Sequence, residues 1–120
     1  MSVHNTHINK MEKTTIVNIK KRELNKRGIT DFEEWQKSPK SVYIGRNMSF
    51  YVKGTTQSKW ANPFSVKKYG RAECLKLYEK YVRECPLSKQ LEELRGKELG
   101  CWCHPEPCHG DILIKLLAEK

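Results

Sequence analysis

Hydrophobic and polar positions divide the chain into short β-branched runs and longer segments with helical spacing. The run Thr14–Ile19 is short and β-branched, which predicts a first strand. Ser41–Gly45 predicts a second strand, and Lys97–Cys103 predicts another near the end of the chain. Ser49–Val52 is a further short extended segment, in which the strand and helix patterns do not separate clearly.

Apolar residues between and after these strands recur at the spacing of helices. From Arg71 to Cys85 they form one continuous stripe, so Cys74 and Cys85 are expected in the core. Thr30 or Asp31 can cap a shorter helix, because their side-chain oxygens accept backbone N–H groups. The predicted helices cover residues 31–35, 71–85, 88–96 and 110–120.

The remaining segments predict a tail and a long loop around one domain. Residues 1–13 contain few apolar side chains, so we expect a flexible N-terminal tail before a single α/β domain of residues 14–120. The tail residues His4 and His7 are expected to be solvated, since ordering a tail around a metal costs backbone entropy. Residues 53–70 predict a loop longer than most connections, which is either functional or loosely ordered.

The alternation of strands and helices predicts the fold class and the place of the site. We expect an α/β fold, a small Rossmann-like open sheet with helices packed on its faces. The C-terminal strand, loop and helix carry a Cys/His motif at residues 101–109. Ligands of open α/β sheets bind beyond the carboxyl ends of the strands. The motif therefore lies where a ligand site is expected.

Charge and cysteine content narrow the classes of partner. Lys and Arg number 23 against 14 Asp and Glu, a net charge of +9, so the surface should attract nucleic acid or phosphate-bearing ligands unless it is only a solvated surface. No apolar run approaches a membrane span or a secretory signal, so we expect no membrane partner and a cytoplasmic, or host intracellular, location. Five cysteines then favour free thiols or a metal site over a disulfide framework.

Three interpretations of the Cys/His motif are open. In the first, Cys101 and Cys103 share one face of a strand and bind zinc with Cys108 and His109, although a one-residue gap is shorter than the usual ligand spacing. In the second, Cys108 at a helix start is a reactive or anion-binding group. In the third, the cysteines are buried strand residues and the Cys108–His109 pair forms a capped turn.

The second interpretation assigns catalytic roles to three neighbouring residues. Cys108 would be the nucleophile, because backbone N–H groups at a helix N-terminus lower the pKa of a thiol. His109, or His104 across the loop, would be the base, and Asp111 would orient an imidazole. Asp111 has a competing structural role, since a carboxylate is favourable in a first helical turn.

A series of short motifs follows the predicted strands and ends at the Cys/His loop. These motifs are Val42–Arg46, Trp60–Phe64, Leu94–Lys97, Leu99–Cys103, Pro105 and Cys108–Asp111. With them the chain resembles the domain of unknown function 4326 family, over about Thr14 to Leu117. Two departures from that family's pattern are an insertion at residues 23–40 and Ala61 in a position where Gly is frequent. The Cys-His loop is also similar to that of the domain of unknown function 488 family, but Gly110 stands where that family has Arg.

The resemblance maps a site without supplying an activity, so the function must come from the residues. Arg46, after a strand end, either pairs with a phosphate or carboxylate or forms a surface ion pair, and Gly110 opens a helix with N–H donors. Trp60 either stacks on a base or anchors the core, and Asn62 either touches ligand or shapes a turn.

Our leading hypothesis is a domain that binds a nucleotide or other phosphate-bearing ligand at the strand ends, with catalysis left open. The alternative is a zinc-stabilised nucleic-acid-binding or interaction module. A third candidate is a viral or phage accessory protein with a protein partner.

Overall fold

The computed structural model describes residues 13–120, whose centre is a three-stranded parallel sheet. The strands are β1 (Thr15–Asn18), β2 (Ser41–Tyr43) and β3 (Glu98–Cys101), in the order β1-β3-β2. Thr15 of β1 and Ser41 of β2 both align with Glu98, so the last strand of the chain occupies the centre. The expected α/β class is confirmed as helices around a small open parallel sheet, and the finer Rossmann-like description stays a prediction.

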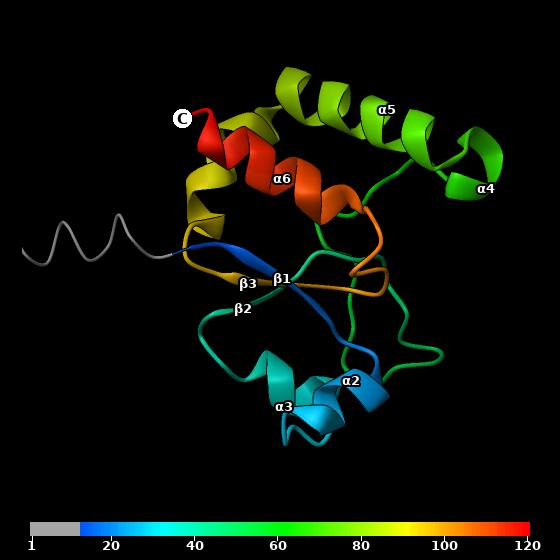
Figure 1. Cartoon of the computed structure of the whole chain (residues 1–120), viewed down its shortest axis with the longest axis vertical. Coiled ribbons are helices and arrows are strands. Elements are labelled where there is room, and N and C mark those ends of the chain that lie inside the picture. Colours follow the sequence, from blue (N-terminus) through cyan, green and yellow to red (C-terminus); the bar gives the residue numbers. More distant parts are fainter. Residues whose placement is uncertain (1–12) are drawn as a thin grey trace, which may run out of the picture.

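Helices cover both faces of this sheet, as Figure 1 shows. The longest, α5, lies with α6 above one face, and α2 with α3 lies below the other. None of the helices within residues 13–120 is long and apolar enough to cross a membrane. The helices are α2 (Lys21–Lys26), α3 (Phe32–Gln36), α4 (Val66–Tyr69), α5 (Arg71–Glu84), the 3-10 helix η1 (Pro86–Leu94) and α6 (His109–Ala118).

Alternating side chains of β3 supply both cores, because successive residues of a strand point to opposite faces. Leu99 and Cys101 are buried in the core below α5 and α6. Gly100 faces the other side, where any Cβ would overlap the ring of Trp35 from α3. The central strand is therefore packed tightly on both faces.

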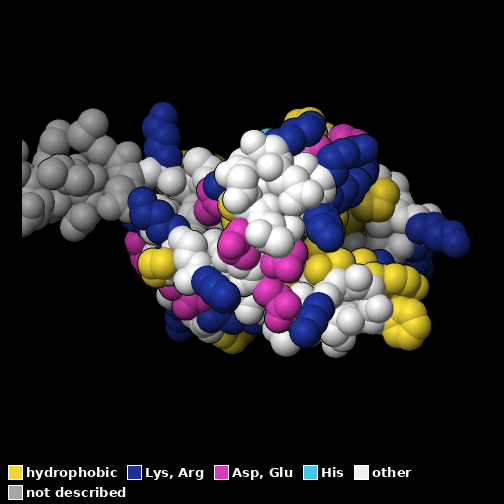
Figure 2. Space-filling view, turned by 90° about the horizontal axis from the view of Figure 1, so that it is seen from below, with side chains coloured by type: hydrophobic (Ala, Val, Ile, Leu, Met, Phe, Trp, Pro, Cys, Tyr) yellow, Lys and Arg dark blue, Asp and Glu magenta, His cyan; other side chains and the backbone are white. Residues whose placement is uncertain are grey.

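The face that carries α2 and α3 is seen from below in Figure 2. Its core consists of Ile19, Leu24, Phe32 and Trp35. Lys and Arg side chains lie beside exposed hydrophobic side chains on this surface (Figure 2). The expected basic surface is therefore not separated from apolar groups.

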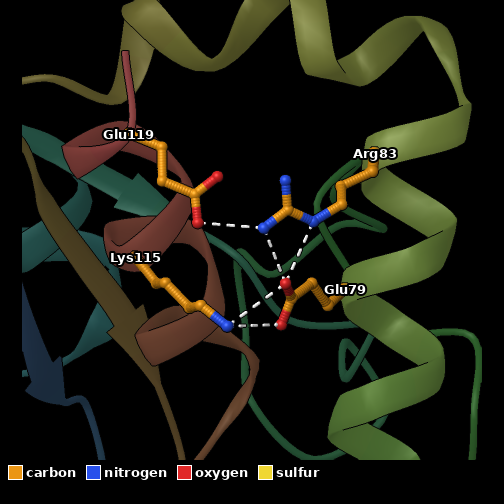
Figure 3. A network of polar contacts seen from close by, with 4 residues as sticks. All are labelled: Glu79, Arg83, Lys115 and Glu119. Atoms are coloured by element: carbon orange, nitrogen blue, oxygen red, sulfur yellow. Dashed lines mark hydrogen bonds and ion pairs between the residues drawn. The ribbon is translucent and has the colours of Figure 1, made fainter.

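An ion-pair network fixes α6 against α5 on the opposite side (Figure 3). The Arg83 guanidinium lies 2.7 Å from the Glu79 carboxylate and 2.9 Å from the Glu119 carboxylate. The Lys115 ammonium lies 3.0 Å from Glu79. Hydrogen bonds from Arg83 and Lys115 hold the pKa of Glu79 below its usual range. Because these groups are exposed, they orient the helices more than they stabilise the fold.

Several local predictions were wrong. Helix α2 follows β1 directly where only the end of a strand was expected, and α4 lies within the predicted loop of residues 53–70. Residues 49–52 form a turn rather than an extended segment. Strand β3 ends at Cys101, and the chain then reverses through a turn in which the Glu106 N–H donates to the Cys103 carbonyl.

The two cysteines predicted in the core of α5 differ in burial. Cys74 is fully buried, as predicted, while Cys85, directly after α5, is half-buried against the core below α5 and α6. Residues 1–12, with His4 and His7, lie outside the described residues.

Candidate functional site

The carboxyl ends of β2 and β3 open into a cavity of about 490 Å³, here called the strand-end cavity. Carboxyl ends of parallel strands meet at one edge of a sheet, so segments far apart in sequence converge here. Three of the predicted ligand and catalytic residues, Arg46, Asn62 and His109, line it together. The full lining is Gly45, Arg46, Met48, Asn62, Pro63, Phe64, Ser65, Val66, Trp102, Cys103 and His109.

Arg46 is the charged residue of this lining. Its side chain is exposed, and its backbone is fixed because the Tyr43 hydroxyl donates to the Arg46 carbonyl at 2.6 Å. None of the ion pairs among residues 13–120 involves Arg46. The lining contains no Asp or Glu, so the guanidinium gives the cavity a positive potential.

Asn62 shapes the wall of the cavity through bonds within the protein. Its side-chain oxygen accepts the Phe64 N–H at 2.9 Å, and its amide donates to the Cys74 sulfur at 3.0 Å. These contacts fold the segment before α4 into an Asx turn. The turn role weighed for Asn62 is therefore present, and its amide is already engaged.

Trp60 does not reach the cavity. Its ring is 2% exposed and belongs to the core, and its carbonyl accepts the Tyr78 hydroxyl at 2.6 Å. Of the two roles considered for Trp60, the packing shows the core anchor. The reason is that the loop turns between Trp60 and Phe64, so that Phe64 supplies an aromatic ring to the cavity instead.

His109 is the first residue of α6 and is held as a neutral imidazole. Its Nε2 lies 2.6 Å from the Ile44 carbonyl oxygen, and since a carbonyl only accepts, Nε2 carries the proton. Burial lowers the pKa of His109, against the opposing effects of that hydrogen bond and of Asp111. The ring also meets Tyr78 edge-on at 5.1 Å between centroids. Nδ1 is therefore left as an acceptor.

Cys108 lies beneath the cavity and pairs with Cys101. Their sulfur atoms are 3.5 Å apart, and each residue is 2% exposed. The hydrogen bond between them lowers the pKa of Cys101 and raises the pKa of Cys108, because it favours the thiolate form of Cys101 and the protonated form of Cys108. N–H groups of Gly110 and Asp111 also point at the Cys108 sulfur. The thiol occupies the place at the helix start where an external anion was expected.

Asp111 and Gly110 have structural contacts that account for their positions. The Asp111 carboxylate accepts the Cys108 N–H at 2.9 Å, which closes a capping box at the start of α6. Gly110 is buried, and a Cβ there would lie 3.1 Å from Ile44 and 3.2 Å from Ile16. Neither residue lines the strand-end cavity.

The four predicted zinc ligands do not form one cluster: Cys101 pairs with Cys108, while Cys103 and His109 line the strand-end cavity. Cys101 is buried while Cys103 is exposed, because the strand that was to align them ends at Cys101. Within residues 13–120, no three or more His, Cys, Asp or Glu side chains form a group that could hold a metal ion. The zinc site stays a prediction. His104, the alternative base, lines a neighbouring cavity, and the amide of Asn18 donates to its carbonyl at 2.8 Å.

Comparison with known protein families shows to which family this chain belongs. Residues 29–119 match the family described as "Domain of unknown function (DUF4326)". The chain belongs to the DUF4326 family. The matched range contains β2, β3, α6 and every residue of the strand-end cavity. The similarity to the 488 family stays a prediction.

This DUF4326 chain has viral and phage relatives. It is 40% identical over 90 residues to the uncharacterized protein R718 of Acanthamoeba polyphaga mimivirus, covering 66% of this chain and 69% of that protein. It is 35% identical over 63 residues to the uncharacterized 12.4 kDa protein in the nrdA-td intergenic region of Enterobacteria phage T4, covering 48% and 58%. No solved structure is significantly similar to it.

Sequence reasoning missed the central aromatic residue of this DUF4326 site. Trp102 follows β3 directly, and its Nε1–H donates to the Tyr43 hydroxyl at 3.0 Å. Its half-buried ring borders the strand-end cavity and two adjoining cavities. The available signal was an aromatic residue in the predicted strand-end motif. The interpretation of this segment rested on the neighbouring cysteines instead.

Proposed function

We propose that the strand-end cavity binds a nucleotide or a closely related phosphate-bearing ligand. One observation carries the proposal: Arg46, which forms no ion pair among residues 13–120, lines the same cavity as two aromatic residues, Phe64 and Trp102, and none of the described residues in that lining is a carboxylate. A guanidinium suits the planar oxygens of a phosphate, and aromatic rings suit a base. The volume of about 490 Å³ falls in the range of small-ligand sites.

The remaining lining residues fit the same ligand class. The Trp102 ring is held in place by the bond of its N–H to Tyr43, so little side-chain freedom is lost when a base stacks on it. The neutral imidazole of His109 offers an acceptor to a ligand N–H or O–H group. Specificity for a nucleotide would therefore come from the rings and His109, and affinity for phosphate from Arg46.

Catalysis is not part of this proposal. Cys108 is buried against Cys101, and the Asp111 carboxylate is engaged by the Cys108 N–H. A nucleophile must reach the ligand, and neither group borders the cavity in this arrangement.

Calorimetric titration with AMP, ATP, adenosine and inorganic phosphate tests the binding. We expect AMP or ATP to bind more tightly than adenosine, which lacks the phosphate for Arg46, and more tightly than inorganic phosphate, which lacks the base for the aromatic rings. Arg46→Ala should weaken nucleotide binding about tenfold or more, the usual effect of losing a charge-assisted hydrogen bond.

Two matched variants control for charge and for the alternative site. Arg95→Ala removes an exposed guanidinium paired with Glu92 outside the cavity, and Asp111→Asn removes the carboxylate of the alternative site while keeping an oxygen that can accept the Cys108 N–H. Both should retain the wild-type nucleotide affinity. Equal affinity of wild-type and Arg46→Ala, or no nucleotide binding by the wild-type protein, would refute the proposed function.

A further inference from the structure

Two neighbouring aromatic rings project into solvent on the loop that follows β2. Phe50 is 91% exposed and Tyr51 is 78% exposed, and their ring centroids lie 5.1 Å apart. The turn beneath them is ordered, because the Met48 carbonyl accepts the N–H groups of Tyr51 and Val52 at 2.8 and 2.7 Å. The rings are thus presented by a fixed turn, and large exposed apolar groups of this kind mark interaction surfaces.

This aromatic pair leads toward the strand-end cavity. A cavity of about 210 Å³ is lined by both Tyr51 and Trp102. Trp102 also borders the strand-end cavity, so the two cavities adjoin at its ring. Phe50, Tyr51, Trp102 and Phe64 therefore form a series of rings across the molecule, here called the aromatic track.

Cations flank the aromatic track. Lys21 and Lys53 line the cavity between Tyr51 and Trp102. Lys20 and Arg22 line a third cavity of about 350 Å³, which Trp102 also borders. Figure 2 shows Lys and Arg side chains beside hydrophobic ones on the α2 and α3 side of the molecule.

Most of the carboxylates in these two cavities are already engaged. Asp31 accepts the Glu34 N–H as the cap of α3, and Glu106 pairs with Arg71. Glu23 lies 3.3 Å from Lys26. Glu33 remains as an acidic group in the lining. Among residues 13–120, none of the ion pairs involves Lys20, Lys21 or Lys53, so these ammonium groups are available to phosphates.

We propose that the aromatic track binds single-stranded nucleic acid. Unstacked bases would pack on the exposed rings, the lysines would contact the backbone phosphates, and one nucleotide would enter the strand-end cavity. This inference rests on the proposed function and names its ligand as part of a polynucleotide. A duplex fits poorly, since its bases are already stacked on one another and cannot reach the rings.

Fluorescence polarisation with a labelled twelve-nucleotide single strand, and with the same sequence as a duplex, tests the proposal. The single strand should bind more tightly than either the duplex or a mononucleotide, and its binding should weaken as salt is added. Phe50→Ala with Tyr51→Ala should weaken single-strand binding about tenfold or more, from the loss of stacking. Both side chains are exposed, so the fold should be retained, as circular dichroism can verify.

A charge-matched pair of variants separates the track from general basicity. Lys21→Ala with Lys53→Ala removes two cations beside the track, and Lys76→Ala with Lys80→Ala removes two from the outer side of α5. Only the first pair should weaken single-strand binding strongly. Equal losses from both pairs would indicate non-specific attraction and overturn the proposal.

Other outcomes distinguish this proposal from the proposed function. If mononucleotides bind and depend on Arg46, but the Phe50 and Tyr51 variant binds the single strand like wild-type, the track proposal fails and the nucleotide site stands. Binding of duplex and single strand with equal affinity would also overturn it. No binding of the single strand by the wild-type protein would assign the exposed rings to another partner, such as a protein.

Discussion

At the scale of single residues, the cysteines of the C-terminal motif have different environments despite their proximity in sequence. Cys101 and Cys108 are buried with their sulfur atoms 3.5 Å apart, while Cys103 is exposed and lines the strand-end cavity. Spacing alone could not separate them, because a strand continued to Cys103 would have placed both earlier thiols on one face. The end of β3 at Cys101 decides the difference.

This difference predicts an order of alkylation in the native protein. Brief treatment with iodoacetamide should modify Cys103 first, because the reagent must contact the sulfur. Cys74, Cys101 and Cys108 should react only after unfolding, and half-buried Cys85 should react at an intermediate rate. Peptide mass spectrometry measures each site, with Cys103→Ser as the control. Rapid modification of Cys101 or Cys108 would contradict the buried pair.

The buried imidazole of His109 predicts a pH dependence of stability. Burial lowers the pKa of His109 in the folded protein, so the unfolded chain binds more protons near its ordinary pKa. The resulting stability is present above the unfolded pKa of about 6.5 and is lost as the pH falls toward the folded pKa. Urea unfolding at pH 7.5 and 5.5 should show a lower free energy of unfolding at pH 5.5. The decrease should be smaller in His109→Gln, and an equal decrease would exclude His109 as the cause.

At the scale of elements, periodicity predicted the structure where one face of a segment is buried. The stripe of α5 is of this kind, whereas β1 was predicted from its β-branched residues, none of which is fully buried. Helix α2 was missed because Leu24 is its one buried residue, so it has no apolar stripe to detect. For the site, order after strands predicted Arg46 and His109 as neighbours, whereas the burial of Trp60 and the place of Trp102 beside the cavity depend on how loops turn in space.

The tight packing of β3 predicts a large effect from a small substitution. Gly100→Ala should lower the free energy of unfolding by about 1–3 kcal/mol, because the added methyl group overlaps Trp35 on the facing helix. Urea denaturation measures the change. Gly100→Ala combined with Trp35→Phe should lose less than the sum of the two single variants, since the smaller ring leaves room. Additive losses would show that Trp35 is not the obstacle.

At the scale of the whole molecule, the two faces of the sheet differ in the size of their cores and in the residues that border them. The face below α5 and α6 holds the larger core, which includes Trp60 and Tyr78. The Tyr78 hydroxyl donates a hydrogen bond to the Trp60 carbonyl within this core. The opposite face has a small core beneath α2 and α3, bordered by cations and exposed rings. The net charge of +9 predicted an anionic partner but could not indicate which face would meet it. Only the tertiary structure shows that Lys20, Lys21, Arg22 and Lys53 line the cavities that Trp102 borders.

The order of the strands also determines when this protein can fold during its synthesis. Strands β1 and β2 do not pair with each other, and both require β3, which spans Glu98–Cys101. A ribosome must therefore synthesise the chain through Cys101 before the complete sheet can form. Until then, β1 and β2 have no strand to pair with. Chains ending at residue 95 should be digested rapidly by trypsin, whereas the full chain should resist. A protease-resistant fragment of that length would show that the N-terminal part folds before the central strand is made.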